Sequence, residues 1–187
     1  MNGDEGNAAR RAAQTIWRIA NDLRGSVDGW DFKTYVLGLL FYRFISENLT
    51  AYINEGERKA GVETFDYTKL TDAEAEIARR ETVAEKGFYI LPSELFLNVR
   101  DQALIDENLN ETLARVFKNI EGSAVGTGSE YDLKGLFDDL DVNSQKLGQS
   151  VAKRNERLVK LLDAIGELQL ATSRTTPSMR LVTPMST

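Results

Sequence analysis

Two residue types that carry much of protein chemistry are missing from this chain of 187 residues. It contains no cysteine and no histidine, which excludes disulfides, thiolate nucleophiles, zinc sites built on either residue and every catalytic arrangement based on histidine. Any catalysis would have to use carboxylates, hydroxyls, lysine or arginine. Because carboxylate pairs can be drawn almost anywhere among 29 acidic residues, we nominate no catalytic residue.

Long apolar runs are missing as well. No window approaches the roughly 20 apolar residues that cross a bilayer, and the first residues lack the apolar stretch of a signal peptide. We therefore expect a cytoplasmic protein without membrane contact. The net charge of -6 argues against a free-standing, non-specific nucleic-acid binder, because neutralising phosphates takes a surplus of Lys and Arg. A local basic patch can still contact DNA inside a larger assembly.

Proline is scarce, with three residues, while 42% of the chain is hydrophobic, and this length suits one domain with a sizeable core. Apolar residues recur at three- and four-residue steps, which is typical of amphipathic helices. The sequence predicts a mainly α, multi-helix bundle. It leaves open one short β-hairpin around 86–92, where an extended run stops at Pro92. The predicted helices cover residues 7–23, 30–56, 71–81, 108–122 and 144–170.

The second predicted helix should be the centre of the core. Between Tyr35 and Ile45 only Gly38 and Arg43 interrupt the apolar residues, so we expect this helix to be enclosed on most sides. Glycine costs a helix about 1 kcal/mol relative to alanine. Gly38 therefore indicates that another backbone packs closely against the helix at this point.

Two stretches resemble ligand-binding loops but lack their essential features. The glycines of GSAVGTG follow a helix rather than a strand, and no lysine comes after them, so a plain linker is the better interpretation than a phosphate loop. The acidic run starting at Asp138 lacks the glycine and the final glutamate of a calcium loop. We predict no metal site.

The last predicted helix carries a basic stripe. Lys153, Arg154, Arg157 and Lys160 recur at three- and four-residue steps opposite the leucines. One interpretation is an exposed helix face paired with nearby carboxylates. The other is contact with phosphates or with an acidic partner. These four residues, with Lys33 as a weaker fifth, are the candidate DNA-binding residues.

The run LRGSVDGWDFKTYVLGLLFYRFISE resembles the N-terminal helical domain of the modification (methyltransferase) subunit of type I restriction-modification systems. YILPSELF and LFDDLDVNSQKLGQSVAKRNERLVKLLDAI resemble later stretches of the same domain. The resemblance covers most of residues 14–170. It implies a subunit of an adenine-specific DNA methyltransferase that joins a specificity subunit, a second modification subunit and a nuclease subunit, with DNA bound by the complex.

The resemblance also implies that catalysis lies beyond this region. In the family, a Rossmann-like domain binds S-adenosylmethionine and an Asn-Pro-Pro-aromatic motif holds the flipped adenine. Neither motif is in this sequence, where the three prolines stand apart. We therefore expect no cofactor in this chain and no activity from it alone.

The last residues differ in composition from the rest. Residues 171–187 are rich in Ser, Thr and Pro, and we predict a helical domain over 1–170 followed by a disordered tail. Family members continue with a run resembling Gly-Asp-Phe, then Asp-Ala-Phe-Gly-Asp-Ala-Tyr-Glu-Tyr. Codons can be chosen for the tail that give this run in a frame shifted by one base, so we infer a single-base deletion after the codon for Leu170.

Two functions follow from these observations. The first is a non-catalytic helical module that helps the subunits assemble and helps close the complex around DNA. The alternative is a truncated remnant that acts only as a protein-protein interaction domain.

Overall fold

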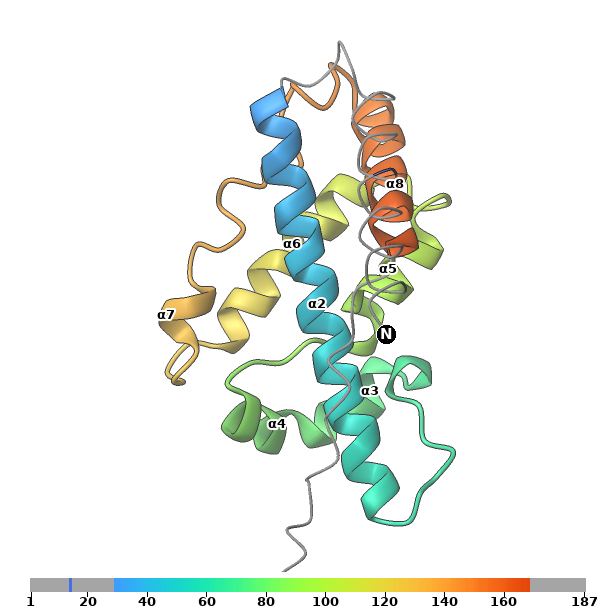
Figure 1. Ribbon diagram of the computed structural model, residues 1–187, viewed down its shortest axis with the longest axis vertical. Coiled ribbons are helices and arrows are strands. Elements are labelled where there is room, and N and C mark those ends of the chain that lie inside the picture. Colours follow the sequence, from blue (N-terminus) through green and yellow to red (C-terminus); the bar gives the residue numbers. More distant parts are fainter. Residues whose placement is uncertain (1–13, 15–28, 169–187) are drawn as a thin grey trace, which may run out of the picture.

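The computed structural model describes residue 14 and residues 29–168, and this described part is helical without a strand. The predicted α class is therefore confirmed. The predicted helix over 7–23 and the predicted tail over 171–187 lie outside the described residues. Figure 1 shows the arrangement of the elements, which are α2 (Gly29–Lys59), η1 (Tyr67–Lys69), α3 (Asp72–Ala75), η2 (Glu76–Ala78), α4 (Arg79–Lys86), η3 (Pro92–Glu94), α5 (Phe96–Gln102), α6 (Leu109–Ser123), α7 (Glu130–Leu133) and α8 (Val151–Glu167).

The long helix α2 supplies the centre of the core, as predicted. One of its sides is buried by α5, α8 and η1, and Tyr42 packs edge-on against Phe117 of α6 with ring centroids 5.5 Å apart. The buried residues on this side recur at helical spacing, which is why a single helix can contact so many neighbours. They are Tyr35, Val36, Leu39, Tyr42, Ile45, Ser46 and Leu49.

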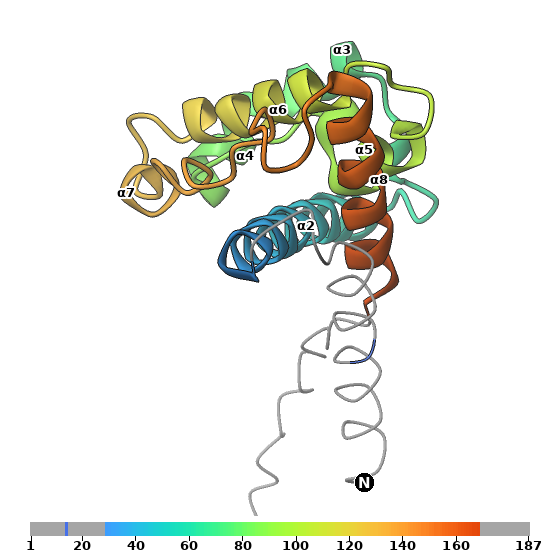
Figure 2. The same cartoon turned by 90° about the horizontal axis from the view of Figure 1, so that it is seen from above.

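The opposite side of α2 differs from the prediction. Leu37 and Phe44 each keep 55% of their surface exposed, so the described elements do not enclose this helix on most sides. Figure 2 shows α5 and α6 on one side of α2 and α8 crossing beside it. An apolar stripe on α2 therefore remains without a partner among residues 29–168.

Gly38 is a point of close packing, but a side chain and not a backbone meets it. A Cβ added at Gly38 would lie 3.0 Å from Cδ1 of Leu140, a residue in the segment between α7 and α8. Few real Cβ atoms approach a neighbour so closely. The missing side chain therefore makes room for Leu140, which is itself buried in the core.

The open alternative of a β-hairpin around 86–92 is not realised, because helical side chains take the place of a partner strand. The backbone N–H of Tyr89 donates to the Ser123 hydroxyl at 2.9 Å, and that hydroxyl lies 3.1 Å from the carbonyl of Tyr89. The Tyr67 hydroxyl donates to the carbonyl of Ile90 at 2.8 Å. The N–H and carbonyl of Tyr89 and the carbonyl of Ile90 are thus satisfied without a β ladder.

Two predicted helix boundaries can be compared with the structure. The Thr71–Glu74 capping box is present, with each side chain bonded to the other residue's backbone N–H. The last helix was predicted to start at residue 144, but α8 starts at Val151, because the Ser150 side chain accepts a bond from the N–H of Lys153 and caps the helix there. Leu147 is fully buried in the preceding loop rather than in the helix.

Arg43, the only charged residue in the apolar centre of α2, holds the end of α8. Its Nη1 donates to the carbonyl oxygens of Ile165 and Leu168 at 2.5 and 2.6 Å, and its Nε bonds to Glu47. The last carbonyls of a helix have no partner within the helix, and a cation is favourable at that end. Arg43 therefore fixes the end of α8 on α2.

Glu94 is the one acidic residue among the buried polar side chains of the described part. Asn119 Nδ2 donates to its Oε1 at 2.5 Å. Burial raises the pKa of Glu94, and the Asn119 hydrogen bond opposes the shift only in part. The folded protein therefore binds this proton more tightly than the unfolded chain does, and stability falls as pH rises from the ordinary value of 4.5 through the raised pKa.

We predict that Glu94→Gln stabilises the fold at neutral pH. Glutamine keeps an oxygen that accepts the hydrogen bond from Asn119, and it removes the buried charge. The expected gain in the free energy of unfolding is about 1.4 kcal/mol for each unit by which the fold raises the pKa of Glu94. Urea unfolding at several pH values should show the gain growing above pH 4.5. The control is Glu74→Gln. The capping bonds lower the pKa of exposed Glu74, so its charge stabilises the fold and the substitution should lower stability at neutral pH. A gain for Glu94→Gln that does not change with pH would contradict this account.

Candidate nucleic-acid interface

The helix α8 carries four of the five predicted DNA-binding residues. Its apolar side, with Leu158, Leu161 and Ile165, is buried against the bundle. Gly148 lets the preceding loop lie close under the first turn, since a Cβ there would be only 2.9 Å from the backbone nitrogen of Arg154. The loop and the helix together decide where each basic side chain points.

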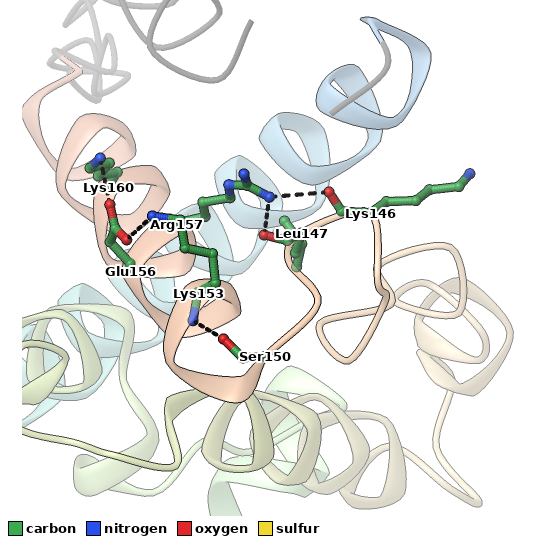
Figure 3. Close-up of polar contacts among 7 residues, drawn as sticks. All are labelled: Lys146, Leu147, Ser150, Lys153, Glu156, Arg157 and Lys160. Atoms are coloured by element: carbon green, nitrogen blue, oxygen red, sulfur yellow. Dashed lines mark hydrogen bonds and ion pairs between the residues drawn. The ribbon is translucent and has the colours of Figure 1, made fainter. Parts of the chain in front are cut away.

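The two lysines point outward and share one carboxylate (Figure 3). Lys153 Nζ lies 2.8 Å from Oε2 of Glu156, and Lys160 Nζ lies 3.1 Å from Oε1. Both lysine side chains are more than half exposed, at 55% and 52%. Hydrogen bonds from the two lysines lower the pKa of Glu156 to about 2. The three residues therefore form an exposed group with one net positive charge.

The two arginines point to the loop before α8 instead. Arg157 Nη1 donates to the carbonyl of Leu147 and lies 3.5 Å from that of Lys146, as Figure 3 shows. Arg154 Nη1 donates to the carbonyl of Gly148 at 3.1 Å, and its Nε is buried without a partner in the described part. Both guanidinium groups are thus used within the fold to hold residues 146–148.

The stripe predicted from sequence is therefore divided in the structure. Lys153 and Lys160 lie together on the exposed side of α8, whereas Arg154 and Arg157 are half-buried. Lys33 is exposed but lies on α2, a different element. The alternative interpretation, pairing with nearby carboxylates, describes the two lysines correctly. DNA contact by any of the five residues stays a prediction.

Next to the lysines is a groove that the sequence did not reveal. It lies between the end of α5 and the outer face of α8, with a volume of about 810 Å³. Leu104 is 82% exposed at its edge, adjoining Ile105 is 76% exposed and Val151 is 43% exposed. The groove is lined by Ala103, Leu104, Asp106, Glu107, Val151, Ala152, Asn155, Glu156, Val159, Lys160 and Asp163.

The groove is lined by both apolar and acidic side chains. Four of its lining residues are acidic and one is a lysine. Asp163 is paired with Arg100 at 3.0 Å, and Asp106 accepts a hydrogen bond from the Thr112 hydroxyl at 2.7 Å. The only signal in the sequence was the pair Leu104–Ile105 in a polar segment without helical periodicity. Two adjacent apolar residues are too short a pattern to show whether their side chains are exposed or buried in the core.

Comparison with known proteins identifies the fold just described. A family model described as the HsdM N-terminal domain matches residues 12–165. The chain belongs to this family. The HsdM N-terminal domain is the helical first domain of a type I restriction-modification methyltransferase subunit, so the resemblance seen in the sequence is confirmed.

Two related proteins show how much of such a subunit the chain represents. It is 47% identical over 162 residues to the type I restriction enzyme MpnII methylase subunit of Mycoplasma pneumoniae, covering 83% of this chain and 30% of that protein. A crystal structure of the type I methyltransferase subunit from Streptococcus thermophilus shares the fold, with a TM-score of 0.69 at 24% identity, over 88% of this chain and 35% of that one. The chain thus spans about a third of the length of these relatives.

In the described part, none of the helices has both the length and the apolar content to cross a membrane. No group of three or more acidic residues within the described ranges is placed to hold a metal ion.

Proposed function

We propose that this HsdM N-terminal domain is a non-catalytic assembly module, and that its groove between α5 and α8 receives a segment of the specificity subunit. The observation that carries the proposal is the set of exposed apolar side chains Leu104, Ile105 and Val151 around one groove. On this proposal, the remaining part of a full-length subunit binds S-adenosylmethionine and methylates adenine. The same part also contacts a second modification subunit and a nuclease subunit.

The chemistry of the groove defines the segment that fits it. Apolar side chains of the partner would cover Leu104 and Val151, and each large aliphatic side chain removed from water contributes about 1.5–3 kcal/mol. Lysine or arginine residues beside them would face Asp106 and Glu107, which also line the groove. An apolar segment flanked by basic residues therefore fits this groove better than an acidic one, because opposite charges across an interface speed and orient association.

Co-elution with the specificity subunit tests the assembly role. We expect the chain to co-elute with that subunit in gel filtration, and we expect the double variant Leu104→Asp, Val151→Asp to elute separately, because both apolar anchors become charged. The control is Ile77→Asp, since Ile77 is 87% exposed on η2 and not part of the groove. Co-elution that survives the double substitution would reject the groove. A chain that binds only itself or another protein would instead favour the truncated remnant.

A second candidate role, contact with DNA, rests on the exposed pair Lys153 and Lys160. Their shared Glu156 leaves one net positive charge on the outer face of α8, and a phosphate can replace a carboxylate as the partner of either lysine. The arginines contribute less on this proposal, because their donors already bond to loop carbonyls. The lysines would thus help close the assembled complex around DNA without reading its sequence.

The salt dependence of DNA binding by the assembled complex tests this role. Each phosphate contact changes the slope of log K against log salt by about 0.9, so Lys153→Ala with Lys160→Ala should flatten the slope by about 2 for any DNA sequence. Arg157→Met is the matched control. It should leave the slope unchanged and instead destabilise the fold by about 1–3 kcal/mol, since a bonded carbonyl loses its partner. An unchanged slope in the lysine variant would reject DNA contact here.

A further inference from the structure

A second hollow lies at the start of α5, whereas the groove lies at the end of this helix. It has a volume of about 380 Å³. Its lining residues come from α2, from the start of α5 and from the last turn of α8, and they include Leu97, which is 48% exposed. Arg43 and Arg100 also line it, with Glu47 as the one acidic residue of the described lining. The hollow therefore combines an exposed apolar side chain with two guanidinium groups.

One side of α8 runs through both the groove and the second hollow. Asn155, Val159 and Asp163 line the groove, and Gly166 lines the second hollow. These four positions recur at three- and four-residue steps, so they share one side of the helix. The rise from Val159 to Gly166 is about 10 Å. The two hollows thus follow each other along the contact between α5 and α8.

An ion pair links the two hollows. Arg100 Nε of α5 lies 3.0 Å from Asp163 Oδ1 of α8, and the two side chains are 28% and 49% exposed. Arg100 lines the second hollow, whereas Asp163 lines the groove. The pair therefore presents its positive charge to one hollow and its negative charge to the other.

The Arg100 guanidinium is held in place and still has donors for a ligand. A Cβ added at Gly166 would lie 2.6 Å from Cζ and Nη1 of Arg100, so the guanidinium occupies the space that a side chain at 166 would fill. Within residues 29–168, the bond from Nε to Asp163 is the one that Arg100 makes. Its Nη1 and Nη2 can therefore donate to a carboxylate, whose two oxygens match the planar guanidinium.

The lining charges give the site a direction. The groove is lined by four acidic residues and one lysine, and the second hollow by two arginines and one glutamate. Glu47 is already paired with Arg43, so Arg100 is the cation that remains for a ligand. Charge complementarity then favours a segment with a basic end over the groove and an acidic end in the second hollow.

We propose that the segment bound in the groove continues along α8 into the second hollow and places an Asp or Glu side chain on Arg100. This inference rests on the proposed function, because it extends the same binding site. The ligand is a peptide with basic residues near Asp106 and Glu107, apolar residues next to them and one acidic residue beyond the groove. An extended chain covers the step from Val159 to Gly166 with about three residues, which sets the spacing between the last apolar residue and the acidic one.

The affinity of the chain for the specificity subunit, measured by calorimetric titration, tests the role of Arg100. Arg100→Met should weaken binding by about tenfold or more, because a hydrogen bond to a charged group is lost. Gly166→Ala should weaken it as well, since the added methyl group displaces the guanidinium and leaves the charge of the chain unchanged. The matched control is Gly122→Ala in the last turn of α6, where an added Cβ meets no described atom within 4 Å. It should not change the affinity.

The outcomes separate this inference from the proposed function. If Leu104→Asp with Val151→Asp abolishes binding while Arg100→Met and Gly166→Ala bind like the unsubstituted chain, the groove is upheld and the acidic contact is rejected. If all of these variants bind normally, the proposed function fails and this inference fails with it. Circular dichroism checks that each variant is folded. Should Arg100→Met unfold, Gly166→Ala keeps the test, because alanine is more favourable than glycine within a helix.

Discussion

The burial of one side of α2 is the constraint on which the rest of the domain depends. Tyr35, Leu39, Tyr42 and Leu49 lie on one side of the same helix and are almost fully buried, so α5, α6 and α8 are all placed relative to the same surface. Arg43 adds hydrogen bonds between α2 and α8 by donating to the last carbonyls of α8. Burying a charged side chain is costly unless it is paired and hydrogen-bonded, and here both conditions are met by Glu47 and the helix end.

This placement of α8 decides which basic residues remain available for a partner. Arg154 and Arg157 hold the loop that leads into the helix, whereas Lys153 and Lys160 lie outside and share Glu156. A stripe that looks uniform in sequence thus has two different roles in the fold. The apolar groove next to it is formed by the end of α5 and the face of α8 together. These two elements contact each other directly, through the Arg100–Asp163 pair among others, and both also contact α2.

The features that could be predicted from the sequence are those that depend on local spacing or on a continuous motif. The cores of α2 and α6, the capping box at Thr71 and the family all follow from spacing or from a continuous motif. Contacts between distant residues were not predictable in the same way. The bonds from Arg43 to Leu168 and the side chains that replace a β partner around Tyr89 each join elements whose relative positions the sequence pattern does not specify. The start of α8 at Val151, in contrast, is set by the local cap at Ser150. The prediction of the candidate site was the least accurate. Spacing shows which residues share a face of a helix, but it does not show which of them form hydrogen bonds within the fold.

Native-state hydrogen exchange measures the central claim, that α2 is the element on which the others are assembled. The amides of Leu39 to Leu49 should exchange only through global unfolding, as expected for the most stable unit of a domain. The amides of the short helix α7 (Glu130–Leu133) should exchange earlier through local opening. Exchange in the centre of α2 that precedes exchange in α6 (Leu109–Ser123) would contradict the account, because α6 would then be stable without the helix that is proposed to organise it.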